Sequence, residues 1–482
     1  MTQVAQREGT AEVRHLIGGE WVGDPTEERR NPARPDEVVA QIASGGEAEV
    51  EAAISAAEGA ATAWRETPAP ARGAILSRAA ELLSARKEQV GRDLCAEEGK
   101  TLAEATMEAG RAADIVRYYG GEGWRLGGES LPSAVPDTQL YTVKEPVGVT
   151  ALITPWNFPI AIPAWKLAPA LVSGNTVVMK PASLTPLSVV HLAQCLMEAG
   201  LPAGVFNIVY GPGKKVGNAL VSDERVRAVS FTGSTAVGLG IHEIASGRLA
   251  RVQLEMGGKN PVIVLDDADP AVAAKIVAQG GYGLTGQACT ATSRVIATRG
   301  GHDAFLAALG KEAENWVPGD GQAEGTKMGP VVSDSQLETD VSYIDVAREE
   351  GAELVTGGDH SDLFFRPAVL AGVDPSMRIA REEVFGPVVS VLEASGVDEA
   401  IAIANDSEYG LSAGIVTNDL KAAMRFAREA EVGVVKINRP TSGLDLNVPF
   451  GGIKSSSTNT FREQGSVAVD FYTRLKTVYL GT

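Results

Sequence analysis

Hydrophobic residues recur at helical spacing near the start of the chain. In residues 47–64 the apolar side chains of Val50, Ile54 and Ala57 lie three or four positions apart. This spacing places side chains on one face of an α-helix. The same spacing continues over residues 72–97. The pattern therefore predicts that the first hundred residues are mostly helical.

Short apolar runs rich in β-branched residues replace this pattern from about residue 140. The runs occupy residues 149–153, 176–180, 205–209 and 227–231, and helix-like segments separate them. Strands that alternate with helices are typical of a parallel sheet with helices packed on its faces. The pattern predicts an α/β fold for this part of the chain.

The helix between the second and third of these runs has start and stop signals. Thr185 suits the N-cap position because its hydroxyl can accept a backbone hydrogen bond, and Pro186 suits the first turn. Gly200 is typical of a helix C-terminus, since glycine adopts left-handed backbone angles without steric cost. We therefore expect a helix between Thr185 and Gly200.

A second alternating block begins near residue 262. An apolar run at 262–265 is followed by a helical pattern over 269–281 and a strand-like run at 293–298. The alternation continues past residues 433–438. A second α/β unit is therefore expected in the C-terminal half of the chain.

Two further segments indicate an arm. Gly and Pro punctuate the strand-like segment 121–146, and residues 466–480 alternate like an exposed strand. An exposed strand edge is an aggregation hazard unless another strand covers it. We expect these segments to pair with another subunit.

Length, charge and cysteine content narrow the class of protein. A chain of 482 residues is too long for one compact core, so two or more domains are expected. The net charge of −18 argues against nucleic acid or an anionic membrane surface as a partner. The sequence has no apolar run long enough to span a bilayer, and its N-terminus lacks a signal-peptide core, so a cytoplasmic location is expected. Three unclustered cysteines and five scattered histidines predict neither a disulfide framework nor a metal site.

Cys289 stands out because small residues surround it in the stretch "GLTGQACTATSR". Free cysteines usually pack as small apolar side chains, so a structural thiol near a turn is one interpretation. The other is a nucleophile that small neighbours leave accessible. No histidine lies near it in sequence, so a carboxylate has to be considered as its base.

Two polar residues follow predicted strands, where ligands meet the carboxyl ends of a parallel sheet. Asn157, in "TPWNFP", offers an amide donor for an oxyanion, although an asparagine that satisfies a turn is an equal alternative. Glu255, in "QLEMGGKN", has apolar neighbours that can raise its pKa and make it a base. A solvated surface glutamate is the commoner case.

Two glycine-rich junctions lie between predicted strands and helices. "SFTGSTAVG" at 230–238 would leave the free N–H groups of a helix N-terminus for a phosphate. "YGPGKKVGN" at 210–218 is the second junction. Neither has the GxGxxG spacing, and turn chemistry alone explains either of them.

Six motifs taken together resemble the aldehyde dehydrogenase superfamily, in the order that this family has them. They are "PWNFP" at 155–159, "FTGS" at 231–234, "EMGGKNP" at 255–261, "GQACTA" at 286–291, "EEVFGPV" at 382–388 and "PFGGIK" at 449–454. The resemblance covers essentially the whole chain. It reduces the weight of a structural role for Cys289 to a small fraction.

The resemblance implies a division of the α/β chain into three parts. A Rossmann-like dinucleotide-binding domain would comprise residues 1–123 and 147–254, and an α/β catalytic domain residues 255–465. An oligomerisation β-arm would comprise 124–146 and 466–482. A homodimer or homotetramer is expected from this arrangement.

The resemblance also implies catalytic roles that make physical sense. Cys289 would attack the aldehyde carbon as a thiolate, and Asn157 would stabilise the oxyanion together with the Cys289 backbone N–H. Glu255 would activate the water that hydrolyses the resulting thioester. Lys166 and Glu463 match the family's supporting proton-relay positions.

The family's cofactor positions are largely present. Lys180 and Ser183 fall where the family binds the adenosine ribose, and Glu383 and Phe385 where it positions the nicotinamide ribose and ring. Further cofactor-lining positions are Ile153, Thr154, Trp156, Gly213, Gly217, Phe231, Thr232, Gly233, Ser234 and Val237. Many NAD-specific members have a glutamate where Ser183 stands. Because a carboxylate would repel a 2′-phosphate, its absence predicts NADP, NAD or both as cofactor.

The substrate positions favour a semialdehyde with a distant carboxylate. Succinate-semialdehyde enzymes usually have an arginine where Trp165 stands. Residues 437–452, however, are similar to the corresponding segment of bacterial 2-oxoglutarate-semialdehyde (2,5-dioxopentanoate) dehydrogenases. Arg439, Thr441 and Ser442 would supply a carboxylate site there, since arginine offers two parallel donors. The alternative is that Arg439 makes a surface or structural ion pair.

Other functions remain open at this point. A general aldehyde dehydrogenase or a succinate- or glutarate-semialdehyde dehydrogenase would use the same catalytic residues. A CoA-acylating enzyme is disfavoured, because such members generally lack the glutamate at position 255. A non-catalytic binding protein is disfavoured by the intact Cys289, Asn157 and Glu255.

Overall fold

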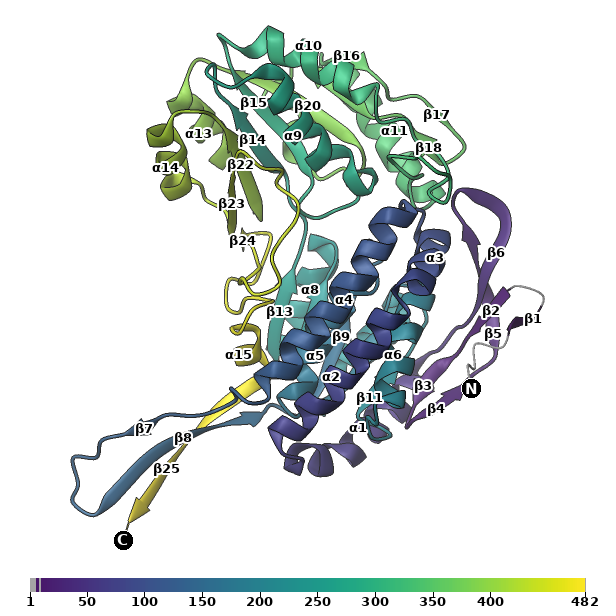
Figure 1. Cartoon of the computed structure of the whole chain (residues 1–482), viewed down its shortest axis with the longest axis vertical. Coiled ribbons are helices and arrows are strands. Elements are labelled where there is room, and N and C mark those ends of the chain that lie inside the picture. The colour runs from purple at the N-terminus through teal and green to yellow at the C-terminus, as the bar shows by residue number, and fades with distance from the viewer. Residues whose placement is uncertain (1–5, 8–9, 482) are drawn as a thin grey trace.

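Two seven-stranded sheets with helices on their faces make up the body of the molecule (Figure 1). The structure is a computed structural model and describes residues 6–7 and 10–481. The first sheet has the order β13-β12-β9-β10-β11-β3-β4. Its strands are β13 Arg251–Glu255, β12 Val226–Thr232, β9 Val149–Ile153, β10 Thr176–Lys180, β11 Phe206–Ile208, β3 His15–Ile17 and β4 Glu20–Val22. The five strands from β13 to β11 are parallel. β3 then pairs antiparallel with β11, and β4 pairs antiparallel with β3.

The second sheet has the order β16-β19-β20-β15-β14-β22-β23. Its strands are β16 Glu353–Thr356, β19 Ala368–Ala371, β20 Val388–Ala394, β15 Thr292–Thr298, β14 Asn260–Val264, β22 Ser412–Val416 and β23 Val434–Ile437. All neighbours in it are parallel except β16, which runs antiparallel to β19. The predicted α/β class is therefore confirmed for both halves of the chain.

Helices cover both faces of each sheet. Around the first sheet they are α1 Glu47–Glu66, α2 Ala69–Ala85, α3 Lys87–Glu98, α4 Leu102–Glu122, α5 Ala161–Val172, α6 Leu187–Glu198, α7 Asn218–Ser222 and α8 Thr235–Ser246, with the π-helix η1 Gly213–Gly217. Around the second they are α9 Pro270–Tyr282, α10 His302–Ala313, α11 Asp334–Glu349, α12 Arg378–Arg381, α13 Val397–Asn405 and α14 Leu420–Glu429, with the 3₁₀ turn η2 Gly283–Gly286. Near the C-terminus lies α15 Ala468–Tyr472.

Both sheets are apolar on both faces, as parallel sheets between helices require. In β9, Leu152 belongs to one buried cluster, while Ala151 and Ile153 belong to the cluster on the opposite face. In β14, Ile263 and Val262 divide between two clusters in the same way. Successive strand residues point to opposite faces, so these continuous apolar runs follow from the two-sided burial.

The remaining strands form smaller sheets. A four-stranded sheet has the order β1-β2-β6-β5, with β1 Gln6–Arg7, β2 Thr10–Val13, β6 Arg34–Ala43 and β5 Pro25–Asn31. Two strand pairs are β17 His360–Ser361 with β18 Phe364–Phe365, and β21 Tyr409–Gly410 with β24 Ile453–Lys454. The arm contains β7 Ser130–Leu131, β8 Thr138–Pro146 and β25 Thr473–Gly481.

The structure corrects the expectation that the first hundred residues are mostly helical. Residues 10–43 form five strands, and helices begin only at Glu47. The strand β5 reads "PTEERRN" and is largely exposed, so its sequence carries no apolar alternation. In addition, the predicted helix over 72–97 is two helices that meet at Arg86.

The helix α6 is found where it was expected, but its N-cap is different. Thr185 makes no cap, and its buried hydroxyl has no hydrogen-bond partner among the described residues. The carboxylate of Glu97, at the end of α3, instead accepts the backbone N–H groups of Leu187 at 2.6 Å and Ser188 at 3.1 Å. A residue ninety positions away thus satisfies this helix N-terminus, which no local pattern reveals.

The arm is a three-stranded sheet that extends away from the body (Figure 1). In it β25 pairs antiparallel with β8 over the nine residues Thr473–Gly481. The expected strand over 466–480 is only partly right, because Ala468–Tyr472 forms the helix α15, whose apolar side chains are buried. The proposed domain bounds stay a prediction, and residues 1–5, 8–9 and 482 within them lie outside the described residues.

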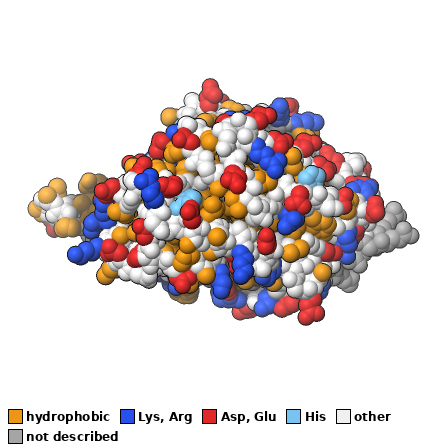
Figure 2. Space-filling view, turned by 90° about the horizontal axis from the view of Figure 1, so that it is seen from above, with side chains coloured by type: hydrophobic (Ala, Val, Ile, Leu, Met, Phe, Trp, Pro, Cys, Tyr) orange, Lys and Arg blue, Asp and Glu red, His pale blue; other side chains and the backbone are white. Residues whose placement is uncertain are grey.

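The surface is mixed in charge. Figure 2 shows acidic, basic and apolar side chains interspersed over one face, without a large area of a single sign. None of the described helices combines the length and the apolar character that a membrane crossing requires.

Candidate active site

The loop that carries Cys289 is held in an unusual backbone conformation. Leu284, Thr285 and Gly286 all have positive φ angles, of 55°, 57° and 68°. A Cβ atom on Gly286 would lie 2.4 Å from the Gly386 backbone, so no larger residue fits there. This turn brings the segment from α9 to β15 against the loop before β20 and leaves Cys289 partly exposed.

Asn260 holds the backbone of the cysteine and of the residue two positions after it. Its side-chain amide donates to the carbonyl oxygens of Cys289 and Ala291, both at 2.8 Å, and its oxygen accepts the Ser412 N–H at 3.1 Å. The cysteine loop is thereby tied to the first residue of β22. Sequence reasoning did not single out Asn260, although it lies within the "EMGGKNP" motif.

Asn157 lies beside the same loop. Its side chain is buried, and its Nδ2 donates to the carbonyl oxygen of Gln287 at 3.0 Å. Gln287 precedes Cys289 by two residues. The predicted proximity of the Asn157 amide to the cysteine loop is therefore present.

A buried ion cluster holds the backbone carbonyl of Asn157. Lys100 donates to the Asn157 carbonyl oxygen at 2.6 Å and to Glu108 at 2.7 Å. Glu108 also accepts the Ile160 N–H at 3.1 Å at the start of α5. Burial alone would lower the pKa of Lys100, but the carboxylates of Glu108 and Glu98 together raise it. The sequence analysis missed this cluster because its members lie in different elements.

Glu255 ends β13 with its carboxylate buried, at 2% residue exposure. Its oxygens accept the Gly452 N–H at 3.2 Å and the Ser457 hydroxyl at 3.3 Å. Burial, and secondly the negative charge of Glu463, raise the pKa of Glu255 well above its usual value. The direction of shift expected from its apolar neighbours is confirmed.

Lys166 and Glu463 are in direct contact in the interior. The Lys166 ammonium contacts one Glu463 carboxylate oxygen and donates to the Ser230 hydroxyl at 2.8 Å. The other Glu463 oxygen accepts the indole N–H of Trp165 at 2.8 Å. The Trp165 ring packs against Phe450, with centroids 6.1 Å apart. Trp165 therefore contacts both Glu463 of the ion pair and the ring of Phe450.

The electrostatic surroundings of Cys289 disfavour its thiolate. Burial raises the pKa of the Cys289 thiol to about 12, and the charges of Glu383, Glu255 and Glu463 contribute to the increase. Because the neutral thiol is the favoured form, its proton has to pass to a base when the nucleophile is used. A carboxylate whose pKa is raised, such as that of Glu255, is a stronger base than an exposed glutamate and suits that task.

Glu383 and Phe385 lie against the same region. Glu383 accepts the Gly258 N–H at 3.0 Å, and a Cβ atom on Gly257 would lie 2.1 Å from its carboxylate. Burial raises the pKa of Glu383 to about 7. The ring of Phe385 meets that of Trp156 edge to face, with centroids 5.4 Å apart. Two candidate cofactor residues from distant segments are thus in contact.

The carboxyl ends of β9, β10 and β12 form one edge of the first sheet. Thr154 and Thr232 follow or end these strands, and their buried hydroxyls have no hydrogen-bond partner in the described part of the chain. A Cβ atom on Gly233 would lie 2.5 Å from the Phe231 ring, so the chain passes close to this ring. Ser234 precedes α8 without capping it, which leaves backbone N–H donors at that helix end. Unpaired buried polar atoms beside free helix N–H groups fit a polar ligand such as a dinucleotide.

The other candidate cofactor residues surround this edge. Lys180 ends β10, donates to the Pro181 carbonyl oxygen at 3.1 Å, and has a pKa lowered by burial. Ser183 is partly exposed. Of the remaining positions, Ile153 and Gly217 are buried and Gly213 is exposed. Val237 lies on α8 and is 54% exposed.

The candidate substrate residues on the loop after β23 differ in their exposure to solvent. Arg439 is exposed and Ser442 is partly exposed. Thr441 is buried, and its hydroxyl shares a hydrogen bond of 2.8 Å with that of Thr292 in β15. The Thr441 side chain is thus engaged by the protein, which leaves Arg439 and Ser442 as the accessible members of this group.

The chain belongs to the aldehyde dehydrogenase family, whose model matches residues 21–478. It is 52% identical to an alpha-ketoglutarate semialdehyde dehydrogenase of Haloferax volcanii, over 97% of this chain and 98% of the relative. It is 45% identical to a 2,5-dioxopentanoate dehydrogenase of Saccharolobus solfataricus, over 96% of this chain and 98% of the relative. A third relative, an alpha-ketoglutaric semialdehyde dehydrogenase of Bacillus subtilis, is 44% identical over 97% of both chains.

Solved structures share the whole fold. A betaine aldehyde dehydrogenase from Staphylococcus aureus, in complex with NAD⁺, has a TM-score of 0.94 and 36% identity, over 97% of this chain and 95% of that chain. An NADP-dependent enzyme from E. coli has a TM-score of 0.94 and 36% identity, over 98% of both chains. The expected aldehyde dehydrogenase fold is therefore confirmed.

Proposed function

We propose that the protein oxidises 2-oxoglutarate semialdehyde (2,5-dioxopentanoate) to 2-oxoglutarate and reduces NAD(P). The observation that carries the proposal is the 44–52% identity to three relatives named for this substrate, over nearly the full length of the chain. Cys289, Asn157 and Glu255 converge from separate elements, which supplies the chemistry that such a reaction needs.

Cys289 is the nucleophile of this proposal. Its thiol loses a proton to a base, and its sulfur forms a bond to the aldehyde carbon, whose oxygen becomes an oxyanion. The Asn157 amide and the Cys289 N–H donate to that oxygen. In the described structure the Asn157 amide is occupied by the Gln287 carbonyl, so it has to exchange this partner for the substrate.

A bound nicotinamide cofactor would supply the hydride acceptor for the carbon attached to Cys289, and Cys289 would then hold the acyl group as a thioester. Glu255 takes a proton from water, the resulting hydroxide attacks the thioester carbon, and the Cys289 sulfur leaves. The charges of Lys166 and Glu463 both alter the pKa of Glu255. In this proposal the Lys166–Glu463 pair passes the proton of Glu255 onward.

NADP, NAD or both would bind at the edge of the first sheet. Lys180 and Ser183 would hold the adenosine ribose, and Glu383 and Phe385 the nicotinamide ribose and ring. Ile153, Thr154, Trp156, Gly213, Gly217, Phe231, Thr232, Gly233, Ser234 and Val237 would line the rest. The unpartnered hydroxyls of Thr154 and Thr232 and the free N-terminus of α8 support this placement.

A cytoplasmic homodimer or homotetramer is proposed. The arm exposes the apolar side chains of Leu475, Tyr479 and Leu480, which a second subunit would cover. Cys95, Cys195 and Cys289 are all free thiols, which suits a reducing compartment.

A substrate panel tests the proposed function. Values of kcat/KM are measured for 2-oxoglutarate semialdehyde, succinate and glutarate semialdehydes, pentanal and benzaldehyde, each with NAD and NADP. We expect the first substrate to have the highest value, and Cys289→Ser to abolish turnover with every aldehyde. A wild-type preference for benzaldehyde or alkanals would favour the general aldehyde dehydrogenase alternative, and dependence on CoA would favour an acyl-CoA product.

A further inference from the structure

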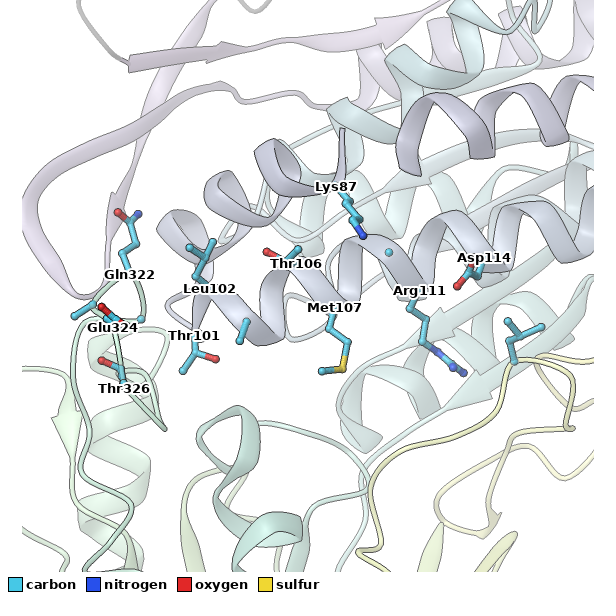
Figure 3. A pocket seen from close by; sticks show the side chains of 16 residues that line it. Lys87, Thr101, Leu102, Thr106, Met107, Arg111, Asp114, Gln322, Glu324 and Thr326 are labelled. Atoms are coloured by element: carbon cyan, nitrogen blue, oxygen red, sulfur yellow. The ribbon is translucent and has the colours of Figure 1, made fainter. Parts of the chain in front are cut away.

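A cavity of about 930 Å³ lies beside the helix α4 (Figure 3). Met107 and Arg111 of α4 project into it, and the segment 321–326 lies at its far end. Leu446, from the long loop before Phe450, lines it as well. The cavity therefore lies where the N-terminal half of the chain faces the loop that contains the catalytic-domain motif "PFGGIK".

Arg111 is one of two half-buried cations that line this cavity, and Lys87 is the other. The Arg111 guanidinium donates to the side-chain oxygen of Gln464 at 3.3 Å. It forms no ion pair with any residue that the structure describes, although the charges of Asp445 and Asp114 reach it. A guanidinium has five N–H donors, so most of them are available to a ligand.

Gln464 adds a second donor where it contacts Arg111, just outside the residues that line the cavity. The residue is 1% exposed, and its Nε2 has no hydrogen-bond partner among the described residues. This nitrogen belongs to the amide whose oxygen Arg111 holds. A buried amide N–H without an acceptor is costly, so it indicates an acceptor that is absent from the protein itself.

The Arg111–Gln464 pair adjoins the residues of the proposed reaction. Gln464 directly follows Glu463, which contacts both Lys166 and Trp165. Glu463 is also close enough to Cys289 for its charge to raise the pKa of that thiol. Because Gln464 directly follows Glu463 and is hydrogen-bonded to Arg111, we place the far end of a ligand that extends from Cys289 at these two residues.

We propose that Arg111 and Gln464 bind the carboxylate of the semialdehyde, so that they determine substrate specificity. This inference rests on the proposed function. A carboxylate has two oxygens that accept from a guanidinium and an amide side by side, which matches the two unused donors. This carboxylate site differs from the one predicted on the loop after β23, where Arg439 is exposed and the Thr441 hydroxyl is hydrogen-bonded to that of Thr292.

The test compares two substrates in three arginine variants. Arg111→Met, Arg439→Met and Arg117→Met are assayed with 2-oxoglutarate semialdehyde and with pentanal, which has the same chain length and no carboxylate. Arg117 is the matched control, because it is an exposed arginine on the same helix, paired with Asp114. Inhibition by 2-oxoglutarate, which carries the same 2-oxo acid end, provides a second measure of carboxylate binding.

We expect Arg111→Met to lower kcat/KM for the semialdehyde at least about 10-fold, which is about 1.4 kcal/mol, mainly through KM. Its kcat/KM for pentanal should change less than about 3-fold, and 2-oxoglutarate should inhibit it at least about 10-fold more weakly. Arg111→Lys should fall between, because it keeps the charge and loses the planar fork. Arg117→Met should leave both substrates unchanged.

Three results would overturn the inference. An equal loss with both substrates would show that Arg111 only positions the segment around Gln464. A selective loss in Arg439→Met, with none in Arg111→Met, would move the carboxylate site to the loop after β23. A wild-type enzyme without preference for the semialdehyde over pentanal would contradict the proposed function itself. The wild type is therefore assayed with both substrates before any variant is made.

Discussion

At the residue scale, the site combines a disfavoured thiolate with carboxyl groups of raised pKa. The pKa of Cys289 is raised to about 12, and that of Glu255 is raised as well, so the surroundings disfavour the charged form of each group. Each shift has burial as its largest cause. Proton transfer between buried groups is consequently part of the proposed chemistry, and side chains that change charge there should have large effects.

The substitution Glu255→Gln separates the two halves of the reaction. The Gly452 N–H and the Ser457 hydroxyl donate to different carboxylate oxygens of Glu255, so glutamine can keep the bond from Gly452 through its own oxygen but has no basic oxygen for water. We expect steady-state turnover to fall roughly 10²–10⁴-fold, while a stopped-flow burst of reduced cofactor persists. Loss of the burst would show instead that Glu255 deprotonates Cys289.

The substitution Ser183→Glu tests the choice of cofactor. A carboxylate at this partly exposed position would repel a 2′-phosphate, so the ratio of kcat/KM values should shift toward NAD by about 10-fold or more. Ser183→Gln is the matched control, since it has the same length without the charge. A wild-type enzyme that strongly rejects NADP would contradict the role given to position 183.

At the element scale, loops from distant parts of the chain position the site. The cysteine loop touches the loop before β20 at Gly286, and Asn260 of β14 ties it to β22. The helix α4 holds the C-terminal segment through Arg111 and Gln464 and through Tyr119, whose hydroxyl donates to the Gly465 carbonyl oxygen at 3.0 Å. Rigid contacts of this kind fix reacting groups to within fractions of an ångström.

The substitution Gly286→Ala tests this tight packing. Gly286 has a φ of 68°, and a Cβ atom on it would lie 2.4 Å from the Gly386 backbone. The cysteine loop therefore has to shift to accommodate alanine. We expect kcat to fall at least about 10-fold and the thermal midpoint to decrease.

Gly283→Ala is the control within the same turn. The φ of Gly283 is −54°, and apart from its chain neighbours no heavy atom lies within 4 Å of the added Cβ. Its activity and thermal midpoint should match those of the wild type. Equal effects of the two alanines would show that glycine flexibility in general, rather than the contact with Gly386, is what the loop needs.

At the scale of the whole molecule, the arm is the feature that bears on the proposed oligomer. The strand β25 pairs with β8 on one side, and several of its apolar side chains are exposed. Edges and apolar faces of this kind are covered in stable proteins, by a second subunit in the proposed oligomer.

Light scattering tests the oligomer directly. We expect a molar mass two or four times the 50.3 kDa of the chain. The double substitution Leu475→Glu with Tyr479→Glu should lower this mass, because charged side chains oppose an apolar interface. A stable wild-type species of 50.3 kDa would contradict the proposal.

Local patterns were sufficient for the elements with continuous apolar runs. The strands β9 and β10 and the helix α1 agree with their predicted ranges to within two residues, because two-sided burial leaves an unbroken apolar signal. The β-strands before residue 44 were missed, because exposed strands such as "PTEERRN" have no such signal. The cap of α6 by Glu97 was missed because its donor and acceptor lie far apart in sequence.

The sequence by itself determined the family and the chemical groups at the site, since six ordered motifs carry Cys289, Asn157 and Glu255 in recognisable contexts. Only the tertiary structure decided which groups meet. It joined Trp165 to Glu463, engaged Thr441 with Thr292, and placed Arg111 in contact with the side-chain oxygen of Gln464. The reason is physical: a side chain's partners depend on folding contacts between segments hundreds of residues apart, whereas a motif reports only the neighbours along the chain.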